Sequence, residues 1–152
     1  MTKAAESSRK LTALARKWKA MEDQTIRSAD LVLAKTTNPL VKTVMEMIKR
    51  DSEKHKLVLQ MIGDSLSKDA PILTPDELKT VSALLNKHME IESRSIELGT
   101  EAYRESRLLV PSYLLSLLLD DEMKHHRMIV QLTDELKKAS IATSTGVRRP
   151  RK

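Results

Sequence analysis

The sequence repeats itself with an offset of 70 residues, the distance from Glu22 to Glu92. Without a gap, this offset aligns pairs of identical residues: Glu22 with Glu92, Ile26 with Ile96, Asp51 with Asp121, Lys54 with Lys124 and His55 with His125. Two similar segments are expected to adopt the same local fold, because the same pattern of side chains directs both. The repeat therefore predicts two copies of one supersecondary unit.

Each half contains two long stretches in which apolar residues recur at intervals of three and four, the spacing of an amphipathic helix. The composition agrees, because the chain has only three Gly and five Pro, and its aromatic residues are limited to one Trp and two Tyr. We expect an all-α chain without strands. The repeated unit is then a helical hairpin.

The boundaries of the first hairpin are set by residues that start or stop helices. A first helix is predicted from about residue 5 to residue 36. Asn38 and Pro39 then combine a helix cap with Pro at the first helical position, which starts a second helix. Gly63 is expected to end it.

The second hairpin follows a polar connection over residues 64 to 74. Thr74, Pro75 and Glu77 form a capping box with Pro at the first helical position, so the third helix is predicted to begin at residue 75. It should end near Arg107, and Pro111 should help to start the fourth helix. We expect residues 1–139 to form one four-helix bundle, because 152 residues with 40% hydrophobic content suffice for a core.

The positive charge of the chain is concentrated at its C-terminal end. Residues 137 to 152 hold six Lys and Arg and no acidic residue, whereas the rest of the chain has equal numbers of basic and acidic residues. Residues 140–152 are polar and basic, which predicts a flexible tail. Its last basic residues are candidate phosphate-binding residues, or else they only improve solubility: Arg148, Arg149, Arg151 and Lys152.

Several classes of function are disfavoured by what the sequence lacks. It has no Cys, which excludes disulfides, thiolate metal sites and Cys nucleophiles. No apolar segment at the N-terminus predicts export, and the longest apolar run, Leu108 to Leu119, is too short to span a bilayer. We therefore expect a cytoplasmic protein without a membrane anchor.

Five polar residues lie on the apolar stripes that should face the core: Glu22, His55, Glu92, Glu122 and His125. A charge in such a place is costly unless it is paired or bound to a metal. In an antiparallel hairpin, residues equally distant from the turn lie at the same height, and these five satisfy that condition. The spacing of three between Glu122 and His125 places both on one face of a helix, where they can bind the same cation.

This pattern resembles the ferritin-like superfamily, and in particular rubrerythrin-like bundles. The resemblance covers roughly residues 10 to 136 and is carried by these motifs: Glu22, Ser52-x-x-His55, Glu92 and Glu122-x-x-His125. It implies a ferritin-like four-helix bundle with a di-metal carboxylate centre. Ser52 departs from the pattern, because it occupies a position where the family has a bridging Glu.

The resemblance also implies a division of the ligands between two ions. One would be held by Glu22, His55 and the shared Glu122, and the other by Glu92, His125 and the same Glu122. The expected metal is Fe or Mn, with Zn not excluded, or none if the site is vestigial. The implied activity is oxidoreductase chemistry on oxygen or peroxide, or metal handling. The chain has no Cys-rich electron-donor module, so any reductant would be a separate molecule.

Four further residues are candidates for supporting roles around the ligands. Ser52 would leave a coordination position for water or an oxidant. His88 is either an additional ligand or a residue that orients Glu92, and Trp18 takes the equivalent place in the first half. Asp51 and Asp121 either accept a hydrogen bond from a ligand His or face solvent.

A second hypothesis comes from a different class of protein. The bundle would then be a non-catalytic binding module whose basic tail engages nucleic acid, a ribonucleoprotein or an acidic partner. The supporting observation is that the net charge lies outside the predicted bundle. Under either hypothesis we expect a homo-oligomer.

Overall fold

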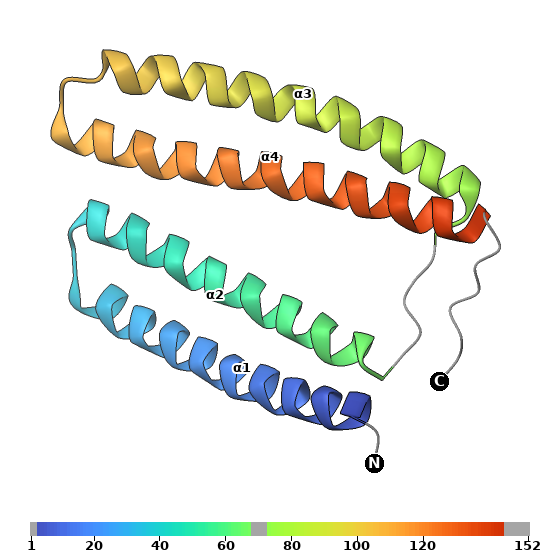
Figure 1. Ribbon diagram of the computed structural model, residues 1–152. Helices are drawn as coiled ribbons and strands as arrows, with labels where there is room; N and C mark the ends of the chain where they lie inside the picture. Colours follow the sequence, from blue (N-terminus) through green and yellow to red (C-terminus); the bar gives the residue numbers. More distant parts are fainter. Residues whose placement is uncertain (1–2, 68–72, 145–152) are drawn as a thin grey trace. The chain divides into compact units, whose positions relative to one another are not determined.

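A computed structural model of the chain describes residues 3–67 and 73–144. Within these residues the regular structure is entirely α-helical (Figure 1). The helices are α1 (Lys3–Lys35), α2 (Pro39–Ser65), α3 (Pro75–Glu105) and α4 (Leu109–Ser144). The prediction of an all-α chain with four long helices is confirmed.

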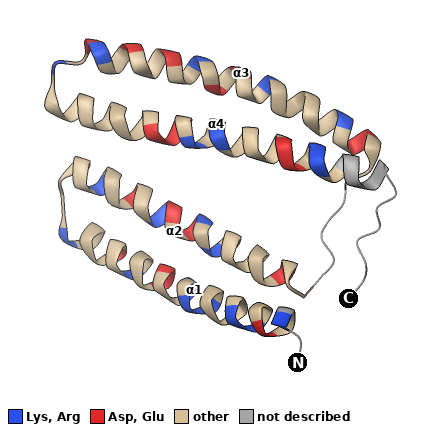
Figure 2. Ribbon diagram, in the orientation of Figure 1, with Lys and Arg blue, Asp and Glu red and all other residues tan. Residues whose placement is uncertain are grey.

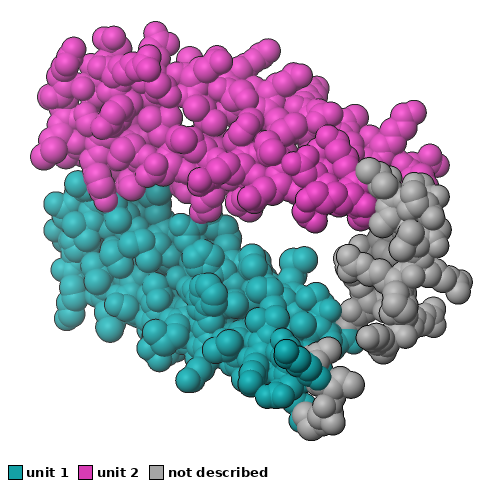
Figure 3. All heavy atoms as spheres, viewed as in Figure 1, with its two compact units in different colours: residues 1–71 teal, residues 72–152 magenta. Residues whose placement is uncertain are grey.

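The chain divides into two compact units, residues 1–71 and residues 72–152 (Figure 3). In the first unit α1 packs against α2, and in the second α3 packs against α4. We call these units the first and second hairpins. The boundary between them agrees with the sequence repeat, so each copy of the repeat is one helical hairpin. The packing of both hairpins into a single bundle stays a prediction.

Two helices begin where the sequence contains capping residues. The side-chain oxygen of Asn38 accepts hydrogen bonds from the backbone N–H groups of Leu40 (2.9 Å) and Val41 (3.1 Å) at the start of α2. At the start of α3, Thr74 and Glu77 form the expected capping box, with Pro75 at the first helical position. These side chains satisfy backbone donors that have no partner inside the helix.

The predicted helix ends are less accurate than the starts. α2 continues past Gly63 to Ser65, so the expectation that Gly63 ends it was wrong. Gly63 keeps a role in the termination, because its carbonyl accepts a hydrogen bond from the backbone of Leu66 at 3.3 Å. α4 continues to Ser144, beyond the boundary expected at residue 139. The remaining part of the predicted tail, residues 145–152, lies outside the described residues.

Small residues allow the two helices of each hairpin to approach one another. Ala29 in α1 is completely buried. Its repeat equivalent in α3 is Gly99, where an added Cβ would lie 2.8 Å from a side-chain carbon of Leu119 in α4. The second hairpin is therefore packed tightly at Gly99.

Charged residues of both signs are interspersed along the helices (Figure 2). In the first hairpin some of them join α1 to α2: Lys49 pairs with Asp30 at 2.6 Å, and Lys56 pairs with Asp23 at 2.5 Å. These pairs are partly exposed, so each contributes little to stability.

The two helical glycines should respond differently to substitution by alanine. Gly63→Ala is expected to stabilise the protein by up to about 1 kcal/mol, because a Cβ there meets no atom within 4 Å and alanine favours the helix. Gly99→Ala should gain less, since Leu119 must move, and Gly99→Leu should destabilise by about 1–3 kcal/mol through overpacking. Urea unfolding measures all three. A Gly99→Leu variant as stable as wild type would contradict the close packing.

Candidate metal centre

The centre of the first hairpin is the carboxylate of Glu22 on α1, which is 8% exposed. Its Oε1 atom accepts a hydrogen bond from Nε1 of Trp18 at 2.8 Å and lies 3.2 Å from Nδ1 of His55 on α2. Ser52 is also buried on α2 and acts on the same carboxylate, lowering the pKa of Glu22. Three side chains therefore surround one buried carboxylate.

These contacts set the charge state of Glu22. Burial acts to raise the pKa of Glu22, but hydrogen bonds from Ser52 and Trp18, together with the charge and hydrogen bond of His55, hold the pKa below its ordinary value. Glu22 is thus an ionised carboxylate at neutral pH. Its negative charge is compensated by groups of its own hairpin.

The second hairpin places a similar carboxylate, Glu92 on α3, at its centre with the same 8% exposure. Its Oε1 atom lies 3.0 Å from Nε2 of His88, one turn earlier on the helix. Its Oε2 atom is buried and has no hydrogen-bond partner among the described residues. Within the described structure, Glu92 therefore has a buried oxygen atom without a partner, whereas neither oxygen of Glu22 is both buried and unpartnered.

Two side chains of α4 complete the cluster. One ligand atom each from Glu92, Glu122 and His125 can be chosen so that all three lie within 4.8 Å of one another. These are a buried and two half-buried side chains from the two facing helices of one hairpin. Carboxylate oxygen and imidazole nitrogen atoms at such separations can bind one divalent cation.

The two carboxylates of this cluster repel one another unless one of them takes up a proton. The pKa of Glu122 is raised, chiefly because the protonated acid can donate a hydrogen bond to Glu92, and also by burial and by the negative charge of Glu92. The charge of His125 acts in the opposite direction. A proton on Glu122 and a cation at the cluster are therefore alternative ways to compensate the same charge.

The two hairpins present these residues at positions related by the repeat. The equivalent pairs are Trp18 and His88, Glu22 and Glu92, Ser52 and Glu122, and His55 and His125. In both hairpins a ring nitrogen one turn before the central Glu contacts its Oε1 atom. The pair that changes the charge of the site is Ser52 and Glu122.

The other predicted residues of the site lie beside these clusters. Asp51 pairs with Lys54 at 2.5 Å, and Asp121 pairs with Lys124 at 3.6 Å, so each aspartate lies within reach of a lysine one turn further along its helix. Nε2 of His88 contacts Oε1 of Glu92. The candidate phosphate-binding residues Arg148, Arg149, Arg151 and Lys152 lie outside the described residues.

The sequence did not reveal every buried polar contact of the two hairpins. The register of Trp18 relative to Glu22 was evident, but its hydrogen bond to the carboxylate was not predicted. In α4, Nδ1 of His126 and Oγ1 of Thr133 are buried without a hydrogen-bond partner in the described part of the chain. Thr133 lies on the apolar stripe of its helix, where an isolated hydroxyl gives no recognisable sequence signal.

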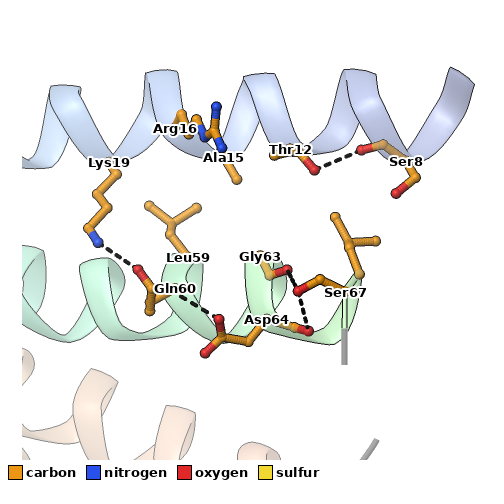
Figure 4. Close-up of a pocket in the computed structure, with 11 residues that line it drawn as sticks. Ser8, Thr12, Ala15, Arg16, Lys19, Leu59, Gln60, Gly63, Asp64 and Ser67 are labelled. Carbon is orange, nitrogen blue, oxygen red and sulfur yellow. Dashed lines mark hydrogen bonds between the residues drawn. The ribbon is translucent and has the colours of Figure 1, made fainter. Parts of the chain in front are cut away.

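A separate pocket of about 510 Å³ lies near the open end of the first hairpin, between α1 and α2 (Figure 4). Its polar lining residues contact one another: Lys19 donates to Gln60 at 2.9 Å, and Gln60 donates to Asp64 at 3.2 Å. None of the predicted site residues lines it. This pocket is therefore not part of the candidate centre.

No family model matches the chain, and no curated protein or solved structure gives a significant match. Among the described residues, no helix combines the length and the apolar character needed to cross a membrane. The geometry of the two clusters is thus the basis for a functional proposal.

The two shifted carboxyls predict opposite pH dependences in metal-free buffer. Ionised Glu22 stabilises the fold above the ordinary pKa of glutamate, and this contribution is lost as pH falls through its lowered pKa. Protonated Glu122 stabilises the fold below the ordinary pKa, and this contribution is lost as pH rises through its raised pKa.

Thermal unfolding of Glu22→Gln and Glu122→Gln between pH 3 and pH 8 tests both signs. Glu22→Gln should be less stable than wild type at neutral pH and approach it in acid. Glu122→Gln should approach wild type in acid and exceed it at neutral pH, because the amide donates at every pH. Parallel curves for wild type and either variant would show that the carboxyl concerned does not have a shifted pKa.

Proposed function

We propose that this protein is a ferritin-like metal-binding protein whose ion is held by Glu92, Glu122 and His125 of the second hairpin. The observation that carries the proposal is the convergence of their three ligand atoms within 4.8 Å. A buried oxygen of Glu92 without a hydrogen-bond partner supports it, because such an atom is costly unless something compensates it. A cation bound there would compensate it.

The donor set indicates which metals fit. Two carboxylates and one imidazole suit Fe and Mn, and they also admit Zn. The sequence contains no Cys, so no thiolate competes for a softer metal. Two ionised carboxylates also match the charge of a divalent cation. We therefore propose Fe or Mn as the physiological ion.

Three protein ligands leave coordination positions for a small molecule, which is typical of reactive rather than purely structural sites. A bound Fe or Mn ion would supply redox chemistry toward oxygen or peroxide, or a site for storing and transferring the metal. Glu92 and Glu122 would bind the ion and balance its charge, and His125 would supply nitrogen. His88 would orient Glu92 through its contact with Oε1.

We also propose that the two hairpins pack with their apolar stripes together, as in a ferritin-like bundle. Each hairpin carries exposed apolar side chains at equivalent positions, such as Leu14 (62% exposed) in the first and Leu84 (63% exposed) in the second. Covering these stripes would remove apolar area from water, which is favourable by about 25 cal/mol per Å². It would also shield the metal cluster from solvent.

The metal proposal predicts a specific pattern of loss. Protein purified without oxygen and reconstituted with Mn(II) or Fe(II) should retain metal after desalting, as counted by elemental analysis. Glu92→Gln, Glu122→Ala and His125→Ala should each lose it, because each removes one of only three ligands. The exposed Glu90 of α3 provides the control, Glu90→Gln, which should bind like wild type. No metal in wild type would contradict the proposal.

The packing proposal predicts different costs at two exposed leucines of α1. Leu14 lies on the apolar stripe, whereas Leu31 lies about 180° around the helix from Glu22. They are similarly exposed within the described structure, at 62% and 68%. Leu14→Asp should destabilise by roughly 2–4 kcal/mol if the stripe is covered, and Leu31→Asp by no more than about 0.5 kcal/mol. Equal small costs, measured by urea unfolding, would contradict packing through this stripe.

A further inference from the structure

The first hairpin has the same backbone plan as the second and carries a carboxylate and an imidazole at equivalent positions. Glu22 and His55 correspond to Glu92 and His125. The sequence and its resemblance suggested that all four are metal ligands. The two central carboxylates differ, however, in the contacts that their oxygen atoms already make.

In the first hairpin, one oxygen of the Glu22 carboxylate already has two polar contacts. Trp18 donates to Oε1 at 2.8 Å, and His55 lies 3.2 Å from the same atom. The buried hydroxyl of Ser52 on the facing helix acts with them to lower the pKa of Glu22. A metal ion that binds Oε1 would compete with the contacts of both Trp18 and His55. Displacing hydrogen bonds to a buried carboxylate is unfavourable, because each is stronger than a bond between neutral groups.

In the second hairpin, the corresponding carboxylate retains a free coordination position. Oε2 of Glu92 is buried and has no hydrogen-bond partner among the described residues. Glu122, which occupies the position of Ser52, brings a second carboxylate to the cluster instead of a hydroxyl donor. An ion that binds here gains ligands without displacing several hydrogen bonds.

The second hairpin also has more potential ligands than the first, and its ligands carry more negative charge. The first hairpin offers Glu22 and His55, two ligands with one negative charge. The second offers Glu92, Glu122 and His125, three ligands with two negative charges. Catalytic zinc sites, for comparison, use three protein ligands. The second hairpin offers that number from its own residues, and the first offers two.

From this contrast we propose that the chain binds a single metal ion, within the second hairpin. The first hairpin does not bind one because position 52 is a serine and not a carboxylate. This inference rests on the proposed function and deepens it by assigning the stoichiometry. Glu22 and His55 then form a hydrogen-bonded centre that stabilises the first hairpin without a metal. Ser52 is the residue that determines which of the two centres binds an ion.

The contacts one turn before the central carboxylates are consistent with this assignment. Trp18 and His88 each direct a ring nitrogen at Oε1 of the following Glu, at 2.8 Å and 3.0 Å. Both therefore position a carboxylate in the same way. The difference in metal binding is thus assigned to positions 52 and 122, which a reciprocal exchange can test.

The experiment counts Mn(II) per chain in the full-length protein after anaerobic loading and desalting. Five proteins are compared: wild type, Glu22→Gln, Glu92→Gln, Glu122→Ser and Ser52→Glu. The expected counts are one for wild type and Glu22→Gln, none for Glu92→Gln and Glu122→Ser, and two for Ser52→Glu. Circular dichroism of each protein verifies that it is folded. Thermal melts with and without Mn(II) give a readout that does not depend on retention during desalting.

Each outcome decides a different point. Loss of metal in Glu22→Gln would overturn the inference, because Glu22 would then be a ligand, and so would two ions in wild type. A folded Ser52→Glu protein that still binds one ion would overturn the role of Ser52. If Ser52→Glu does not fold, Glu22→Gln and Glu122→Ser still decide where the ion is bound. No metal in wild type would reject the proposed function itself, and the inference with it.

Discussion

A carboxylate buried between two helices is the constraint on which the centre of each hairpin depends. Glu22 and Glu92 are equally enclosed, and a negative charge in such a place must be compensated. In the first hairpin the compensation comes from the hydrogen bond of Trp18 and from His55, and Ser52 also lowers the pKa of the carboxylate. In the second, His88 contacts one oxygen of Glu92 and leaves the other without a partner. Among the described residues, the two hairpins therefore differ in whether the central carboxylate keeps a buried oxygen atom without a partner.

The internal repeat makes the two hairpins directly comparable. Both hairpins place their central residues at matching positions on matching helices, so position 52 and position 122 have the same backbone setting. A hydroxyl at the first position gives a self-contained hydrogen-bonded centre. A carboxylate at the second position gives a cluster of two carboxylates and an imidazole, which we propose binds a cation. We interpret the pair as one ancestral arrangement that has acquired two different roles.

Much of the fold was predictable from the sequence because its determinants are local. Asn38 and the Thr74–Glu77 capping box act within one turn of the helices that they start, and the apolar spacing determines which side of each helix faces its partner. The helix ends at Ser65 and Ser144 were harder to predict, since extending a helix by one turn changes its energy little.

The candidate site was predictable only in part. The repeat and the spacing of Glu122 and His125 indicated which residues share a hairpin, and the cluster of Glu92, Glu122 and His125 lies where they placed it. The hydrogen bond from Trp18 to Glu22 and the unpartnered oxygen of Glu92 depend on side-chain orientations across the helix interface. Those orientations arise from tertiary packing, which spacing along one helix does not encode.

Diffraction from crystals grown with Mn(II), using the anomalous signal of manganese, tests the central claim most directly. Our account predicts one anomalous peak per chain, within bonding distance of Glu92, Glu122 and His125. A peak bonded to Glu22 or His55, or no peak in either hairpin, would contradict it.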